Sequence, residues 1–135
     1  MNEINDTKKL LERYPFLRVD DSDEFSWWDD IPEGWRIAFG IPMMEELREQ
    51  LIKEGKLDTY HIRDVKEKWG SLRWYDSGSS DEVQDIINKY EYLSIKTCIV
   101  CGKPATEMTK GWIWPVCHAC YQNFEKGGRP NRDGC

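Results

Sequence analysis

Four of the five cysteines of this chain lie in two closely spaced pairs near its C-terminal end. Cys98 and Cys101 have two residues between them, and after fifteen further residues Cys117 and Cys120 repeat that spacing. Two intervening residues allow a tight turn that points both thiolates at one ion, and two such pairs supply the closed tetrahedral sulfur set of structural zinc. The sequence therefore predicts one structural Zn²⁺ per chain, bound by all four cysteines.

The residues around the two pairs fit a zinc-ribbon or treble-clef module. We expect a hairpin from Met108 to Trp114 between the pairs and a helix over residues 119–126 after them, which is the treble-clef order. These flanks favour zinc over an iron–sulfur centre, although the spacing alone is compatible with iron. Because four cysteines already fill the shell, we expect His118 to be an exposed residue that binds no metal and Cys135 an exposed thiol without a role.

Catalytic chemistry finds little support in the sequence. A catalytic zinc ion needs an open coordination position, and four cysteine ligands leave none. The zinc deaminases require His-x-Glu and Pro-Cys-x-x-Cys; here Pro115 stands one residue too far from Cys117, and no His-x-Glu occurs. Walker, dinucleotide-binding, nucleophile-elbow and His-Glu-x-x-His motifs are also missing. We therefore expect a protein that is not an enzyme and assign no catalytic residue.

A second candidate site lies in the stretch over residues 66–75, where cations alternate with aromatic residues. In a strand, period two turns Leu72 and Trp74 toward the core and places Arg73 and Tyr75 on the opposite face. Such a face can stack a base, hold a phosphate or anchor a protein. The alternative is that a helix or the segment of Trp27 and Trp28 covers it, with Arg73 paired to an aspartate. The candidate binding residues are Arg73, Tyr75, Lys66, Lys68 and Trp69.

Helices and a small hairpin must position these two sites. The predicted elements are a helix over 7–14, a loop over 18–34, an extended segment over 34–40, a helix from Pro42 to about Gly55, strands over 60–69 and 71–75, and a helix that ends near Ile95 and begins with a capping box of Ser79 and Glu82. The predicted fold class is α+β, a small antiparallel hairpin or sheet with helices. Residues 1–95 form the body, and residues 96–135 form the zinc module, docked on the last helix of the body.

Charge and composition narrow the classes of protein. The 135 residues carry a net charge of −6, and from Lys96 onward six basic against three acidic residues leave +3 there and −9 in residues 1–95. No apolar run reaches membrane-spanning length, and the N-terminus lacks a secretory pattern. An odd cysteine count then argues against a disulfide framework. We expect a cytoplasmic protein of unknown oligomeric state.

Several of these motifs together resemble a family of small, uncharacterised bacteriophage and prophage proteins. The resemblance covers roughly residues 30–120 and is carried by segments 33–40, 65–75, 97–105, 111–113 and 117–120, above all by Lys68-Trp69-Gly70-Ser71-Leu72-Arg73-Trp74-Tyr75 and the cysteine pairs. It implies a phage-type accessory protein of the host cytoplasm with a C-terminal four-cysteine zinc module. It implies no activity. An acidic residue often stands in that family at the position of His118, so no role is carried over to it.

Three functions are compatible with these features. The first is a non-enzymatic, zinc-stabilised phage-type protein that binds a host protein, for instance in counter-defence or host modulation. The second is a nucleic-acid-binding zinc protein, which the basic C-terminal third favours and the acidic body opposes. The third is a binder of a small nucleotide through Arg73, Tyr75 and neighbouring tryptophans. We expect the first.

Overall fold

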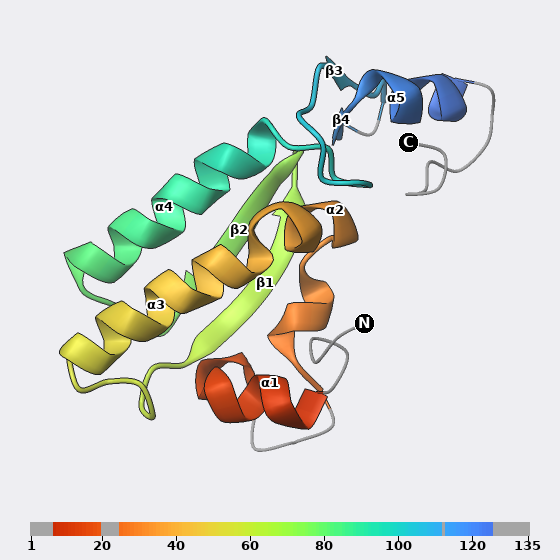
Figure 1. Cartoon of the computed structure of the whole chain (residues 1–135). Helices are drawn as coiled ribbons and strands as arrows, with labels where there is room; N and C mark the ends of the chain where they lie inside the picture. The colour runs from red at the N-terminus through yellow and green to blue at the C-terminus, as the bar shows by residue number, and fades with distance from the viewer. Residues whose placement is uncertain (1–6, 20–24, 112, 126–135) are drawn as a thin grey trace.

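The computed structural model describes residues 7–19, 25–111 and 113–125. These residues form helices and two small antiparallel hairpins, which confirms the α+β class (Figure 1). The helical elements are α1 (Thr7–Arg13), η2 (Pro15–Leu17), η3 (Trp27–Asp30), α2 (Glu33–Trp35), η4 (Arg36–Gly40), α3 (Ile41–Lys53), α4 (Asp81–Ile95) and α5 (His118–Glu125). The strands are β1 (Ile62–Lys68), β2 (Ser71–Asp76), β3 (Glu107–Met108) and β4 (Pro115–Val116).

The first helix is held against the third by charge and hydrogen bonding. Helix α1 ends at Arg13, one residue before the predicted end, because Pro15 cannot continue the helical hydrogen-bond ladder. Arg13 then donates two parallel hydrogen bonds to the Glu45 carboxylate on α3, from Nε at 2.7 Å and from Nη2 at 2.8 Å. The Tyr14 hydroxyl donates to the same carboxylate. Glu45 is therefore the residue that joins the N-terminal segment to α3.

The prediction of an extended segment over residues 34–40 is wrong. The chain there is helical throughout, because α2, the π-helix η4 and α3 follow one another without a break. Apolar residues recur at every fourth position and all of them are buried: Ile31, Trp35, Phe39, Met43, Leu47 and Leu51. Pro42 lacks a backbone N–H, and the wide π turn stands directly before it. Burial of one continuous apolar stripe thus outweighs the weak helix propensity of Gly34 and Gly40.

The β1–β2 hairpin has the predicted orientation. Val65 lies opposite Trp74, and Lys68 lies opposite Ser71 as the last pair before the turn. Leu72 and Trp74 are buried, whereas Tyr75 is exposed on the other face, so the inside and outside assignments of β2 are confirmed. Trp69 was expected to lie in the first strand but lies in the turn.

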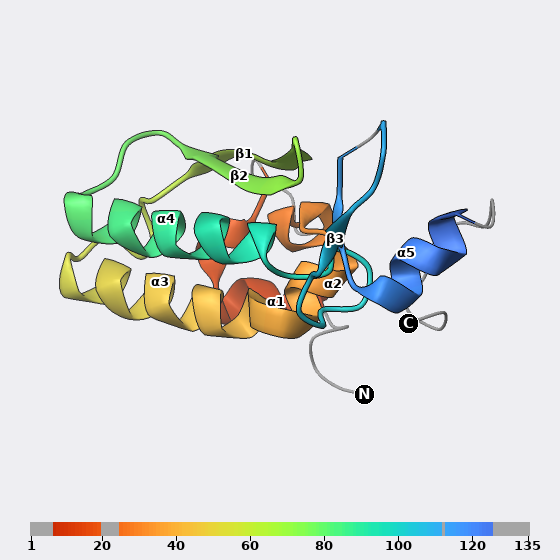
Figure 2. The ribbon, with the colours of Figure 1, turned by 90° about the horizontal axis from the view of Figure 1, so that it is seen from above.

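Helices lie on one side of this hairpin. In Figure 2, α4 lies next to β1 and β2, and α3 lies on the far side of α4, with α1 at the level of α3. The core between the layers contains the Trp74 indole, whose Nε1–H donates to the Tyr60 hydroxyl at 3.0 Å. That hydroxyl in turn donates to Asp76 Oδ2 at 2.7 Å. The opposite face of the hairpin carries no helix among the described residues.

Helix α4 begins one residue later than the capping box predicts. Ser80, not Ser79, is the N-cap, because its Oγ accepts a hydrogen bond from the Val83 N–H at 3.1 Å. The acidic residues Asp81 and Glu82 occupy the first turn, where they complement the positive end of the helix dipole. The predicted C-terminal end near Ile95 is confirmed, and the chain passes from there directly into the first cysteine pair.

The segment predicted as a loop over residues 18–34 contains short helical turns. Trp27 begins the 3-10 helix η3, Glu33 begins α2, and residues 20–24 lie outside the described residues. The Trp28 indole is buried and Trp27 is half-buried. Helix η3 packs beside β1.

Candidate metal centre

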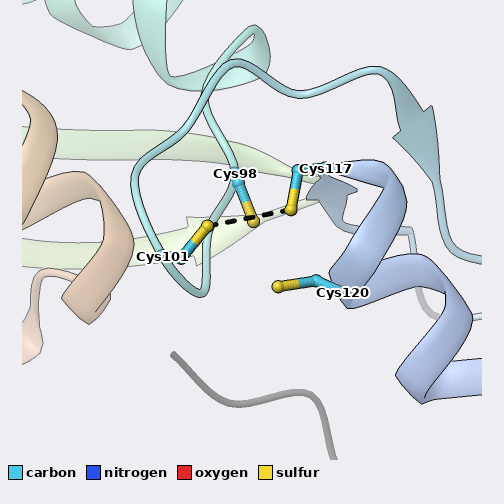
Figure 3. A group of neighbouring side chains, drawn as sticks. All are labelled: Cys98, Cys101, Cys117 and Cys120. Atoms are coloured by element: carbon cyan, nitrogen blue, oxygen red, sulfur yellow. Dashed lines mark hydrogen bonds between the residues drawn. The ribbon is translucent and has the colours of Figure 1, made fainter. Parts of the chain in front are cut away.

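The structure brings the four predicted cysteine ligands together. Cys98 and Cys101 lie in the turn after α4, Cys117 directly follows β4, and Cys120 lies in the first turn of α5 (Figure 3). Their four Sγ atoms all lie within 4.8 Å of one another. None of the four side chains is more than 9% exposed. Four sulfur donors gathered in a buried position can hold a metal ion.

The four sulfurs do not form covalent pairs with one another. Cys98, Cys101 and Cys117 are free thiols, so no disulfide joins any two members of the group. The Sγ atoms of Cys101 and Cys117 are 3.8 Å apart, whereas a disulfide requires about 2.05 Å. The spacing suits four separate ligands around a cation.

The electrostatic environment favours a cation at this point. Burial opposes ionisation of Cys98, yet the backbone N–H groups of Cys101, Cys117 and Val100 donate to its sulfur, and together they lower the pKa of this thiol. Burial, together with the hydrogen bonds to the Cys98 and Cys117 sulfurs, raises the pKa of the Cys101 thiol to about 11. Adjacent thiolates repel one another in a buried site, and a bound metal ion removes that penalty.

Close contacts with α2 fix the first cysteine pair. The Gly34 N–H donates to the Ile99 carbonyl at 2.9 Å, and the buried Trp35 indole donates to the Thr97 carbonyl at 3.0 Å. A Cβ atom on Gly34 would lie only 2.3 Å from the Cys98 carbonyl oxygen, so no larger residue fits there. The turn that carries Cys98 and Cys101 therefore lies directly on the N-terminal end of the long helical stretch.

The second pair is held by the small β3–β4 hairpin. The Ile99 N–H donates to the Pro115 carbonyl at 2.9 Å, which ties the first cysteine turn to β4. The hairpin expected between the pairs is present, with its loop between β3 and β4 and Trp112 outside the described residues. Helix α5, expected over residues 119–126, runs over His118–Glu125.

His118 points away from the sulfur group. Its side chain is exposed, and its Nδ1 lies 2.6 Å from Glu107 Oε2 on β3. The four-cysteine group contains no histidine among the described residues. The structure thus places His118 in a surface hydrogen bond between β3 and α5. The fifth cysteine, Cys135, lies outside the described residues.

The structure separates the five candidate binding residues into two groups. Lys66 and Arg73 lie opposite each other on the outer face of the hairpin. The Lys66 ammonium is 5.6 Å from the centre of the Tyr75 ring and 3.2 Å from Asp64 Oδ2. Arg73 is half-buried, and its Nε has no hydrogen-bond partner among the described residues. Lys66, Arg73 and Tyr75 form the first group, which we call the outer-face group.

The second group, Lys68 and Trp69, lies at the tip of the hairpin. Both side chains line a cavity of about 190 Å³ together with Glu67, Gly111 and Ile113. Sequence analysis missed Gly111 and Ile113, which come from the loop between β3 and β4. Only the glycine after Lys110 marks that loop as a turn, and no pattern shows that the two turns meet.

Comparison with known proteins finds no matching family model, no similar curated protein and no similar solved structure. Among the described residues, no helix has both the length and the apolar character required to cross a membrane.

Proposed function

We propose that the four cysteines bind one structural zinc ion in a zinc-ribbon or treble-clef-like module, and that the protein is a non-enzymatic, phage-type accessory protein that binds a host protein in the host cytoplasm. The observation that carries the proposal is the closed and buried group of four sulfurs. Its members are Cys98, Cys101, Cys117 and Cys120. The order turn, hairpin, helix around them is that of a treble clef.

Distances within the group fit zinc. Four sulfurs at about 2.3 Å from a central ion form a tetrahedron whose corners are about 3.8 Å apart. The Cys101 and Cys117 sulfurs are 3.8 Å apart, and none of the six sulfur pairs exceeds 4.8 Å. Zinc prefers this geometry with thiolate ligands.

A structural role follows from the number of ligands. A catalytic zinc ion binds water or substrate at a position that the protein leaves open. Here sulfur fills all four positions, and Cys98 and Cys120 are fully buried. The ion would stabilise the fold around it and would not meet a substrate.

Binding to a protein is favoured by the exposed part of the β1–β2 hairpin. Tyr75 and Trp69 are exposed aromatic residues beside lysines, and aromatic residues are enriched at protein interfaces. The net charge of −6 opposes binding to a nucleic-acid polyanion. The resemblance of residues 65–75 and of the cysteine segments to phage proteins favours a host protein as the partner.

Two measurements test the proposal. Elemental analysis of the protein purified under reducing conditions should find one zinc ion per chain; iron in its place, or metal far below one per chain, would contradict it. Affinity capture from bacterial lysate should then retain the same host protein with the wild type and with Tyr92→Ala, an exposed aromatic control on α4. The double variant Arg73→Ala, Tyr75→Ala should lose it. Capture of nucleic acid, with no protein that depends on these residues, would favour the second function.

A further inference from the structure

The cavity of about 190 Å³ lies where two turns from distant parts of the chain meet. One turn joins β1 to β2, and the other lies in the loop between β3 and β4; Figure 2 shows the first directed toward the β3–β4 hairpin. They approach closely because Gly70 has no side chain. A Cβ atom there would lie 3.0 Å from the Ile113 carbonyl oxygen and 3.2 Å from Met108 Cε. The cavity therefore belongs to both the body and the cysteine-bearing segment.

Trp69 occupies an unfavourable backbone position at this cavity. Lys68 pairs with Ser71 across the hairpin, so Trp69 and Gly70 form a two-residue turn, and both have positive φ, +57° and +81°. That is a type I′ turn, which favours Asn-Gly. A bulky residue at positive φ is a genuine outlier.

Burial in the core does not compensate for this strain, because the Trp69 side chain is 70% exposed. Strained residues of this kind concentrate at functional sites. The nearby side chains of Met108 and Ile113 are also large, apolar and exposed. The turn thus holds a large indole in solvent at the mouth of an apolar cavity. Asparagine at this position would give a more stable protein.

We propose that this cavity is the docking site for an acidic protein segment that inserts one large apolar side chain beside Trp69. The proposal rests on the proposed function and deepens it by giving the chemistry of the partner. Pockets for small molecules begin at roughly 300 Å³, and this cavity of about 190 Å³ is too small for a nucleotide. It suits a single anchor side chain, the unit that dominates protein interfaces.

Charge at the rim selects an acidic segment. Lys68 lines the cavity and Lys110 directly precedes Gly111; both are exposed, and neither forms an ion pair within the described part of the chain. The Glu67 carboxylate accepts the Gly70 N–H at 2.8 Å and so holds the turn. Carboxylates that flank the anchor can therefore pair with these two lysines. A long polyanion would instead meet the acidic remainder of the molecule.

Selection of a random linear peptide library on the immobilised, reduced, full-length protein tests this inference. The enriched peptides should share one large apolar residue flanked by aspartate or glutamate. A labelled peptide of that consensus should bind about tenfold more weakly, or worse, to Trp69→Ala and to Lys68→Glu. Its affinity for Tyr92→Ala should be unchanged, because Tyr92 is also an exposed aromatic residue but lies on α4, outside the cavity.

The variant Trp69→Asn separates a binding role from a structural one. Asparagine suits the type I′ turn, so we expect Tm to rise by a few degrees while peptide affinity falls about tenfold. Unchanged affinity in Trp69→Asn would overturn the inference, as would the absence of an acidic consensus. Trp69-dependent binding of an oligothymidine probe in place of peptides would assign the cavity to nucleic acid. Peptides whose binding depends on Tyr75 but not on Trp69 would contradict a docking site at the cavity. They would leave the proposed function intact.

Discussion

The backbone N–H of Trp74 in β2 donates to the Glu91 carboxylate on α4, at 2.9 Å. One turn further along α4, Ser94 Oγ accepts the Leu72 N–H at 2.8 Å. These two N–H groups point away from β1, and without α4 they would form an unpaired strand edge. The side chains of Glu91 and Ser94 thus accept both outward N–H groups of β2. Helix α4 therefore closes that edge of the hairpin.

Removing the Glu91 acceptor should destabilise the fold. In Glu91→Ala the Trp74 N–H loses its partner while it remains at the covered edge, which costs about 1–3 kcal/mol of unfolding free energy. Glu91→Gln keeps an acceptor oxygen and serves as the matched control, with a loss below about 1 kcal/mol. Urea denaturation of the three proteins measures the difference. Equal stability of Glu91→Ala and the wild type would show that the edge is not closed by this bond.

Gly34 tests the contact between α2 and the first cysteine turn. In Gly34→Ala the new Cβ would stand 2.3 Å from the Cys98 carbonyl oxygen, so the backbone must shift, at a cost of about 1–3 kcal/mol or more. Amide exchange should accelerate over residues 97–102. Gly55→Ala is the control, because it has a φ of +69° but open space around it. It should cost about 1–2 kcal/mol from the backbone alone and leave exchange at the cysteines unchanged.

Acid should weaken the link between α1 and α3. The hydrogen bonds from Arg13, and then that from the Tyr14 hydroxyl, lower the pKa of Glu45 from its ordinary 4.5 to about 2. Between pH 4.5 and about 2, the folded protein therefore binds fewer protons than the unfolded chain. The contribution of Glu45 is complete above pH 4.5 and is lost as the pH falls toward 2.

A pH series of thermal unfolding measures this contribution. Glu45→Gln should be less stable than the wild type at pH 7, and the gap between their Tm values should narrow as the pH falls below 4.5. Glu49→Gln, on the same helix and exposed, should follow the wild-type curve. A gap between Glu45→Gln and the wild type that stays constant down to pH 2.5 would contradict the assignment.

Loss of one cysteine should release the metal. In Cys101→Ser three sulfurs remain, and we expect zinc content well below one per chain and loss of much of the structure over residues 96–126. Structural zinc contributes on the order of 10 kcal/mol in small modules. His118→Ala should retain the metal, because His118 pairs with Glu107 on the surface. Elemental analysis measures the zinc content, and amide exchange measures the loss of structure. Full zinc occupancy in Cys101→Ser would refute a four-cysteine site.

Local spacing was sufficient to predict the cysteine group and the orientation of β2. The spacing of two Cys-x-x-Cys pairs is enough to predict that the four cysteines lie together. The alternation of apolar and polar residues around Leu72 and Trp74 shows which face of β2 is buried. The helix from Pro42 onward was predicted, whereas its continuation back to Glu33 was missed because Gly34 and Gly40 look like boundaries. The glycine at 34 is instead required by the close approach of Cys98, a contact across more than sixty residues that no local pattern contains. The repeat of Trp35, Phe39 and Met43 at intervals of four was the signal available.

The cavity at Trp69 could not be predicted from the sequence for a related reason. Its walls come from two turns more than forty residues apart, and their meeting depends on the position of the whole cysteine-bearing segment. The alternation of cations and aromatic residues in the sequence marks Lys68 and Trp69 as candidates, but it predicts the same surface for them as for Arg73 and Tyr75. The positive φ of Trp69 turns the chain at the hairpin tip and separates the two groups.

The hydrogen bond from the Trp35 indole to the Thr97 carbonyl has a consequence for biosynthesis. The two residues are 62 positions apart, which a ribosome covers in about 3–12 s at roughly 5–20 residues per second. Throughout that interval the indole and the apolar stripe behind it emerge without the segment that will bury them. The nascent chain therefore presents the Trp35 indole to the cell before its first cysteine, Cys98, is made, and exposed apolar surface of this kind promotes association.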